Sequence, residues 1–223
     1  MNVMAEAFEW LSDSARWSGA GSIPQRLLEH VAITGLVVLL ASIIAIPLGV
    51  LIGHTRNGKA AVVGTAGALR AIPSLGLLTL VGLYSGIGLT APVVALIVLA
   101  IPSLLAGAYS GVESVDNQTV GAARAIGMSE RQIVWKVELP IAAPVIVGGI
   151  RAATLQVVAT ATLAAYVADF GVGRFVFSGL KSGNYAPMLG GAILVIALAI
   201  ILEILLASAH RASRKISNPA LQP

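Results

Sequence analysis

The 223-residue chain contains no cysteine, few aromatic residues and few charged ones. The lack of cysteine excludes disulfide bonds and thiol chemistry. Aromatic residues make up 5% of the chain and charged residues 11%, whereas hydrophobic residues make up 57%. The mean hydropathy is +0.91, far from the value of an ordinary soluble domain. This composition predicts an all-α integral membrane protein, built as a single domain over residues 1–223.

The sequence contains several long runs of apolar residues. A helix needs about 20 apolar residues to cross roughly 30 Å of hydrocarbon, and the runs lack the alternation of outer-membrane barrel strands. We expect about five transmembrane helices, at residues 31–53, 61–83, 91–111, 141–167 and 186–209.

Lysine and arginine are unevenly divided between the two sides that these spans define. The four on one side are Arg16, Arg26, Arg174 and Lys181, and the eight on the other are Arg56, Lys59, Arg124, Arg131, Lys136, Arg211, Arg214 and Lys215. The positive-inside rule therefore predicts a multi-pass plasma (inner) membrane protein of a bacterium, with its N-terminus outside and its C-terminus in the cytoplasm. This orientation predicts that residues 1–25 form an extracytoplasmic segment. It also predicts that residues 112–140 form a cytoplasmic loop and residues 210–223 a cytoplasmic tail. The net charge of +4 follows from this topology and gives no reason to expect a nucleic-acid partner.

The N-terminal segment has neither a basic start nor a long apolar core, so we do not expect a cleavable signal peptide. Met4, Phe8, Leu11 and Ala15 fall at helical spacing. They predict a short helix that lies on the membrane surface or on the helix bundle, with plain disorder as the alternative.

The cytoplasmic loop predicts two short helices joined at a glycine. Asp116 can cap the first helix, and Gly127 is the residue type that commonly ends one. Ser129 and Gln132 form a capping-box pattern for the second helix, and Pro140 predicts a stop before the next span.

Three interpretations of this helix pair compete. It could be an amphipathic connector on the lipid surface, a DNA-binding helix-turn-helix, or a docking element for a cytoplasmic protein. DNA binding is disfavoured because both ends are tied to membrane spans and because acidic residues outnumber basic ones there. The acids are Glu113, Asp116, Glu130 and Glu138.

Residues 121–140, "GAARAIGMSERQIVWKVELP", resemble the EAA loop of type I ABC import permeases. The matching positions are Ala122, Ala123, Gly127, Val137, Leu139 and Pro140. The departure is Gly121, which stands where the pattern has glutamate. The resemblance favours the docking interpretation, with these positions as the loop that couples to an ATPase.

Residues 70–116, and the run "VELPIAAPVIVGGIRAAT", are similar to the glycine betaine, carnitine and choline permeases of that group. The resemblance implies a type I (MetI-like) permease fold and a subunit that translocates a compatible solute. It also implies a second permease subunit, either identical or different, two cytoplasmic ABC ATPases that bind ATP and Mg²⁺, and an external solute-binding protein. The chain itself is then expected to be no enzyme and to hold neither cofactor nor metal.

A nucleotide site within the chain is not expected. Gly53, Gly58 and Lys59 have P-loop spacing, but Ala60 replaces the Ser or Thr that would hold Mg²⁺. A membrane span also precedes them where a strand is needed, so we interpret this stretch as a cytoplasmic turn.

A solute pathway is predicted from polar or special residues in the spans. Arg70 and Pro73 resemble the start of a pore-lining helix in type I permeases, and Thr154, Thr160 and Tyr166 bring hydroxyls into the fourth span. Ser and Thr can instead bond to their own helix backbone. A quaternary ammonium solute favours an aromatic cage, which this chain can hardly supply, so selectivity is expected to lie in the external binding protein.

Other conspicuous residues have structural interpretations. Arg151 and Glu203 fall within or beside predicted spans, and for Glu203 an ion pair or snorkelling is favoured over a proton relay. The three histidines, His30, His54 and His210, are expected at span ends, where they are solvated or snorkel to the interface. Glycine pairs at GxxxG spacing predict close helix packing at Gly49/Gly53, Gly82/Gly86 and Gly107/Gly111.

The external loop at residues 168–187 is glycine-rich and carries Arg174 and Lys181, which we expect to help dock the binding protein. Three alternative functions remain open from the residues. They are an amino-acid permease of the same type, such as one for methionine, an ion-coupled secondary transporter, and a membrane scaffold that recruits a cytoplasmic partner. An ion-coupled transporter would be expected to show paired intramembrane carboxylates or a repeated half.

Overall fold

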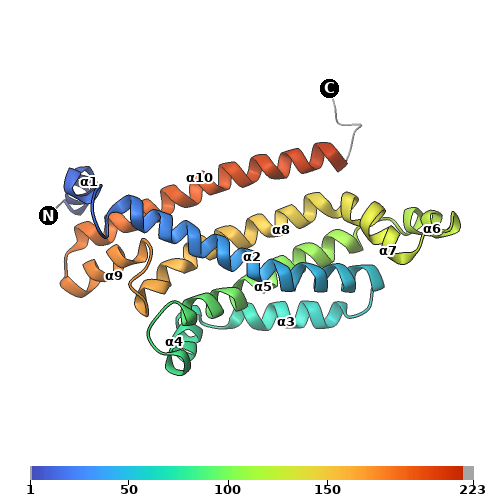
Figure 1. Cartoon of the computed structure of the whole chain (residues 1–223), viewed down its shortest axis with the longest axis horizontal. Helices are drawn as coiled ribbons and strands as arrows, with labels where there is room; N and C mark the ends of the chain where they lie inside the picture. Colours follow the sequence, from blue (N-terminus) through green and yellow to red (C-terminus); the bar gives the residue numbers. More distant parts are fainter. Residues whose placement is uncertain (1, 218–223) are drawn as a thin grey trace. The chain divides into compact units, whose positions relative to one another are not determined.

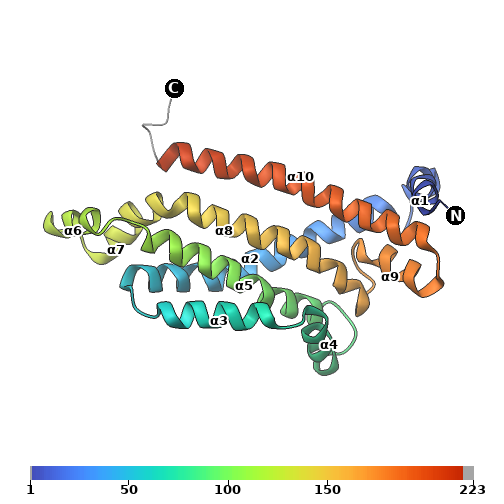
Figure 2. The same cartoon turned by 180° about the vertical axis from the view of Figure 1, so that it is seen from behind.

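The computed structural model describes residues 2–217, and the side chains of all of these except 63, 212 and 214–217. Met1 and residues 218–223 of the predicted tail lie outside the described residues. Figures 1 and 2 show a chain whose described elements are all helical. In order they are α1 (Val3–Ser12), η1 (Ser14–Arg16), α2 (Ile23–Thr55), α3 (Lys59–Ala71), α4 (Ser74–Ser85), α5 (Thr90–Glu113), α6 (Asn117–Ala125), α7 (Glu130–Ile133), η2 (Val134–Glu138), α8 (Leu139–Thr160), η3 (Ala161–Tyr166), α9 (Gly173–Ser182) and α10 (Tyr185–Ser217).

Four stretches of helix within residues 2–217 are long and apolar enough to cross a membrane. They are α2, α5, the continuous helical stretch Glu130–Tyr166, and the part of α10 over Tyr185–Arg211. The span predicted at residues 61–83 is interrupted, because α3 ends at Ala71 and α4 begins at Ser74. Pro73 caps α4 in an extended conformation, with ψ at 117°. Counted as one broken span, this pair makes five, the predicted number.

The chain forms two compact units, and each of the long helices α2, α5, α8 and α10 contributes residues to both. Among the described residues, unit 1 comprises residues 2–38, 72–99 and 154–202, and unit 2 comprises residues 39–71, 100–153 and 203–217. Each unit has its own interior, and each is described separately below.

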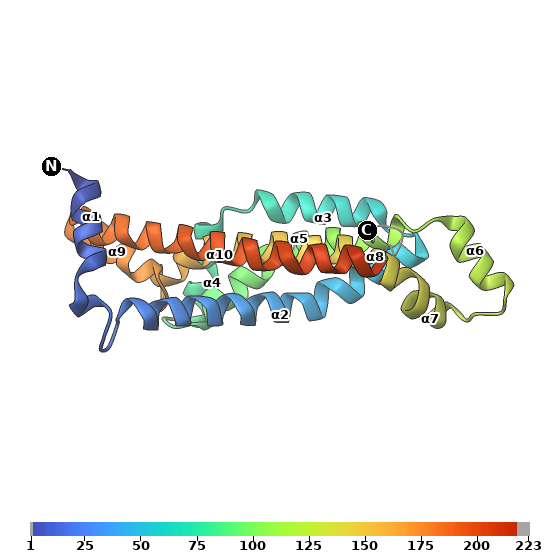
Figure 3. The ribbon, with the colours of Figure 1, turned by 90° about the horizontal axis from the view of Figure 1, so that it is seen from above.

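In unit 1 the N-terminal helix is attached through a tryptophan. The Trp10 ring meets the Phe175 ring edge-on, with their centroids 5.1 Å apart. Gly190 leaves the space that this ring needs, since a Cβ there would lie 2.5 Å from the tryptophan. The predicted short helix is therefore confirmed, but the predicted apolar face is not the packed one, because Met4 and Phe8 are exposed. Figure 3 shows α1 beside α9 and the start of α10.

A polar cluster lies near the start of α2 in the same unit. Arg26 donates to a carboxylate oxygen of Asp169 at 2.9 Å, and Arg174 pairs with the same carboxylate at 3.1 Å. His30 is fully buried and its Nε2 lies 2.9 Å from the carbonyl oxygen of Val158. The expectation of a solvated His30 was wrong, because α2 begins at Ile23, well before the predicted start of the span.

Part of the predicted glycine-rich loop at residues 168–187 is helical. Residues Gly173–Ser182 form α9, which ends at Gly183 in the left-handed conformation. Gly173 allows a close approach of the backbone, because a Cβ there would lie 2.0 Å from the carbonyl oxygen of Thr162. Backbone contact, which the sequence pattern does not reveal, positions this helix.

In unit 2 the long helices pack closely through glycine, as predicted for two of the three pairs. A Cβ at Gly49 would lie 2.7 Å from the Cβ of Ala108, and one at Gly107 would lie 2.7 Å from the Cα of Gly149. The third pair is different, since Gly86 has a φ of +77° and ends α4 with no neighbour that a Cβ would meet. Gly86 is thus suited to its position by the positive φ of the backbone, and not by close packing between helices.

The two conspicuous ionisable residues of the spans are paired within unit 2. The Nε of Arg151 donates to one carboxylate oxygen of Glu203 at 2.8 Å, and a terminal nitrogen of Arg151 donates to the other. This bidentate pair joins α8 to α10 and confirms the structural interpretation of Glu203.

Candidate functional site

The first helix of the predicted docking pair has the expected caps. Asp116 accepts a hydrogen bond from the first turn of α6, and Gly127 follows the helix with a φ of +86°. The N–H of Gly127 donates to the carbonyl of Arg124 at 2.9 Å, and that of Met128 donates to the carbonyl of Ala123 at 3.1 Å. These two bonds make a Schellman motif, which needs a left-handed residue at position 127.

The second helix begins as predicted but does not end as predicted. Ser129 and Gln132 form the capping box, with bonds of 2.8 and 3.4 Å. From α7 the chain then passes through a π-helix, Val134–Glu138, directly into α8. Pro140 is the second residue of α8, so its interpretation as a stop was wrong. The wide π-turn just before it leaves room for a proline ring that would clash within a regular helix.

A small apolar core holds α6 and α7 together. Its members are Val115, Val120, Ala123 and Ile133, with Met128 and Val137 packed against them. The signature positions Ala123 and Val137 therefore face inward, whereas Gly121 and Ala122 lie on the exposed side. Ile126, at the turn between the helices, is 79% exposed, which is unusual for a large apolar side chain. Figure 3 shows the chain reversing between α6 and α7.

A chain of ionic contacts ties this pair to the end of α2. Arg124 binds both carboxylate oxygens of Glu130, at 2.8 and 2.9 Å, and these hydrogen bonds raise the pKa of Arg124 above its usual value. Glu130 also lies 3.1 Å from Nε2 of His54, whose Nδ1 lies 2.7 Å from Glu138. Glu138 is only 3% exposed, so His54 is the partner of a buried acid. Each of the two ring nitrogens of His54 thus faces one carboxylate.

Sequence reasoning missed His54 and Glu138 as a pair. His54 was expected to be solvated at a span end, but its side chain is only 13% exposed. The one signal available in the sequence was an acid, Glu138, placed directly before a long apolar run. No spacing rule connects two residues 84 positions apart.

The turn after α2 supports the same region. Arg56 donates to the carbonyl of Val115 at 3.1 Å, and Lys59 lies 3.4 Å from Glu113. Arg56 and Gly58 both have positive φ. The stretch with P-loop spacing is thus a turn between α2 and α3, as expected.

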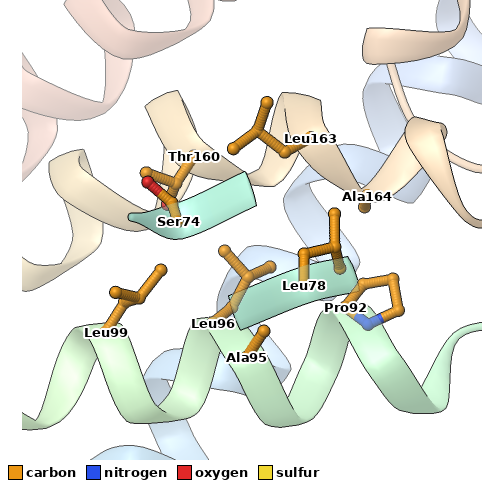
Figure 4. Close-up of a pocket in the computed structure, with 9 residues that line it drawn as sticks. All are labelled: Ser74, Leu78, Pro92, Ala95, Leu96, Leu99, Thr160, Leu163 and Ala164. Atoms are coloured by element: carbon orange, nitrogen blue, oxygen red, sulfur yellow. The ribbon is translucent and has the colours of Figure 1, made fainter. Parts of the chain in front are cut away.

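A small pocket in unit 1 contains one of the predicted pathway residues. Figure 4 shows its lining, which comes from α4, α5, α8 and η3. The lining residues are Ser74, Leu78, Pro92, Ala95, Leu96, Leu99, Thr160, Leu163 and Ala164. Its volume is about 10 Å³, room for about one water molecule. Thr160 donates to the carbonyl of Gln156 at 2.8 Å, so its hydroxyl is satisfied by its own helix.

The structure does not bring the other pathway residues to this pocket. Pro73 precedes the pocket residue Ser74, and Thr154 lies on α8 away from the lining. Tyr166 is exposed, with its ring 5.7 Å from that of Phe177. Arg70 is exposed in the last turn of α3, in unit 2. A role for these residues in solute passage stays a prediction.

The two predicted docking cations lie on α9. Arg174 is at its start and is paired with Asp169, whereas Lys181 is in its last turn and exposed. Lys181 is therefore the less constrained of the two charges.

Comparison with known families gives a match over most of the chain. Residues 45–215 match the model of the family described as binding-protein-dependent transport system inner membrane component. The match includes the whole of α6, α7 and η2.

Similar curated proteins have permease names. The chain is 32% identical to the choline transport system permease protein OpuBB of Bacillus subtilis, covering 87% of this chain and 89% of that protein. It is also 32% identical to the glycine betaine/carnitine/choline transport system permease protein OpuCB of Bacillus subtilis, covering 92% and 93%. The resemblance seen in the sequence is thereby confirmed.

Among solved structures, the chain is similar to the MetNI methionine ABC transporter in an inward-facing conformation. The TM-score is 0.75 at 26% identity, covering 86% of this chain and 95% of the other. The predicted MetI-like fold is confirmed by this similarity.

The contact between His54 and Glu138 leads to a testable prediction. His54→Ala leaves a buried carboxylate without its partner, at a local cost of roughly 3 kcal/mol. Backbone amides of residues 112–138 should then exchange hydrogen faster in the purified protein. The control is Arg124→Gln, which breaks an exposed pair and should change exchange little. Equal exchange in His54→Ala and the wild type would contradict the anchoring role.

Proposed function

The chain belongs to the binding-protein-dependent transport system inner membrane component family, and we propose that it is the permease subunit of an ATP-driven importer for a compatible solute. Glycine betaine, choline and carnitine are the proposed solutes. The observation that carries this proposal is the capped helix pair at residues 116–138, which has the spacing of an ATPase-coupling loop and lies in the matched region.

The solute class is supported by the names of the relatives, which are permeases for choline and for glycine betaine, carnitine and choline. An amino acid such as methionine is the second candidate, because the chain is also similar in fold to a methionine transporter. The identities of 32% with the first group and 26% with the second favour the osmoprotectants.

The coupling surface is proposed to be the outer face of α6 and the turn that follows it. Gly121, Ala122 and Ile126 are exposed there, and the apolar Ile126 is suited to a groove on a cytoplasmic ATPase. Gly121 has no neighbour within 4 Å of a Cβ built there, so the space beside it is open to a partner. Contact at position 121 would come from the partner.

The assembly is proposed to contain two permease subunits, two cytoplasmic ATPases that bind ATP and Mg²⁺, and an external solute-binding protein. The N-terminus would lie outside and the coupling helices in the cytoplasm, in agreement with the distribution of lysine and arginine. This chain supplies the passage and the coupling surface, and ATP hydrolysis belongs to the partner.

Weak solute binding within the permease agrees with the pocket in unit 1. Its volume of about 10 Å³ is too small for a quaternary ammonium solute, and its lining contains no aromatic side chain. Selectivity is therefore proposed to reside in the external binding protein, and the pocket would have to widen during transport.

An ion-coupled mechanism has less support. The acid that could serve it, Glu203, is engaged by Arg151 in a bidentate ion pair. A carboxylate held in this way favours a structural role over proton carriage.

Uptake measurements test the proposed activity. In a bacterial strain that lacks its own osmoprotectant systems, this subunit supplied with its ATPase and binding protein should import labelled glycine betaine, choline or carnitine. Inactivating the ATPase should abolish uptake. Uptake that persists without ATP hydrolysis, or uptake of methionine alone, would overturn the proposal.

The turn at Gly127 provides a test of coupling. Gly127→Val places a β-branched side chain at a φ of +86°, which strains the backbone between α6 and α7 although no neighbour obstructs it. We expect normal membrane insertion but at least tenfold less uptake per ATP hydrolysed. The matched control is Gly19→Val, which places the same side chain at a φ of +87° with open space around it, outside the coupling loop, and should insert and couple normally. Normal coupling in Gly127→Val would count against the docking role.

The exposed cation on α9 tests the external partner. Lys181→Glu should weaken stimulation of ATP hydrolysis by the solute-loaded binding protein, with the effect largest at low salt. Basal ATP hydrolysis should not change. If the Lys181→Glu variant and the wild type show the same stimulation at every binding-protein concentration, Lys181 does not take part in docking.

A further inference from the structure

Two pockets in unit 2 share the side chain of Trp135. The first, here called the apolar groove, lies between the last turns of α2 and the π-helix, with a volume of about 310 Å³. The second, here called the basic pocket, lies on α7 and the π-helix, also with a volume of about 310 Å³. Trp135, 66% exposed, separates an apolar site from a charged one.

The apolar groove follows the surface of α2. Its lining residues are Ile46, Pro47, Val50, Leu51, His54, Val134, Trp135 and Leu139. From Ile46 to His54 the groove runs along the helix for about 12 Å. Leu51 is 57% exposed beside it, so the groove is an open apolar surface that reaches well into a membrane-spanning helix.

The basic pocket carries positive charge that the described part of this chain leaves unpaired. Its lining residues are Ser129, Arg131, Gln132, Trp135 and Lys136. Neither Arg131 nor Lys136 forms an ion pair within residues 2–217. The acids nearby in sequence are already engaged, Glu130 by Arg124 and Glu138 by His54.

We propose that these two pockets together bind one anionic phospholipid. An acyl chain would lie in the apolar groove, the phosphate would meet Arg131 and Lys136, and the Trp135 ring would lie at the level of the headgroup. Tryptophan is enriched at that level, and basic pockets beside membrane helices bind anionic headgroups.

A lipid fits this site better than a protein. A soluble ATPase would have to reach Ile46, about 12 Å further along the spanning helix α2 than His54. A second copy of the chain could cover the groove with an apolar helix, but such a helix would leave Arg131 and Lys136 without partners. An anionic lipid satisfies the apolar and the charged surface with one molecule.

Quenching of Trp135 fluorescence by brominated lipids tests the proposal. The double variant Trp10→Phe/Trp17→Phe leaves Trp135 as the single tryptophan of the full chain, which is then reconstituted in vesicles. Brominated phosphatidylglycerol should associate at Trp135 at least tenfold more tightly than brominated phosphatidylcholine, since each basic residue near the surface contributes about fivefold. Raising the salt to about 0.5 M should reduce this preference without any further substitution.

Variants of the same background supply the controls. Arg131→Gln/Lys136→Gln should remove the preference for phosphatidylglycerol, and Leu51→Ala should weaken association with both lipids. Arg174→Gln/Lys181→Gln changes the net charge by the same amount on α9 and should leave the preference intact. Each variant is first shown to be folded by its elution as a single species in size-exclusion chromatography.

Two results would overturn the proposal. One is equal quenching by the two lipids, or a preference that survives Arg131→Gln/Lys136→Gln. The other is complete protection of Trp135 from both lipids once the ATPase or a second permease subunit is bound, which would assign the groove to a protein. The comparison of the two lipids uses the permease chain alone, so its outcome does not depend on the transport proposal.

Discussion

The fold depends on the requirement that every backbone N–H and C=O in the hydrocarbon be hydrogen-bonded within the protein. The chain can therefore leave helical geometry at only a few places. One is the interruption before α4, where Pro73 is extended. Before Pro140, by contrast, a π-turn keeps the helix continuous. As a result Glu130–Tyr166 is one helical stretch, in which α7 is continuous with the span that follows it.

Buried charged side chains are under a similar constraint, because a buried charge without a partner is costly. In unit 2, Glu203 is held by Arg151, and Glu138 is held by His54. Each of these pairs joins two helical segments that are far apart in the sequence. Arg131 and Lys136 are exposed and form no ion pair within residues 2–217, which suits them to the anionic headgroup proposed above.

Polar groups are placed differently in the two units. The pocket of unit 1 has little room, and the hydroxyl of Thr160 is bonded to its own helix. The helix pair of unit 2 instead has capped ends, its own small core and an exposed Ile126. This placement agrees with the proposal that the chain provides a passage and a coupling surface, and that solute recognition resides in an external binding protein.

The sequence alone determined the features that depend on neighbouring residues. These are the apolar spans, the caps at Asp116 and Ser129, and the left-handed Gly127, because hydropathy and local hydrogen bonds act over a few positions. Only the tertiary structure decided the burial of His30, the contact of His54 with Glu138, and the passage of the helix through Pro140. The first two depend on which distant segment lies beside the histidine, and the third depends on a local change of helical pitch. The spacing of residues along the chain predicts neither of these causes.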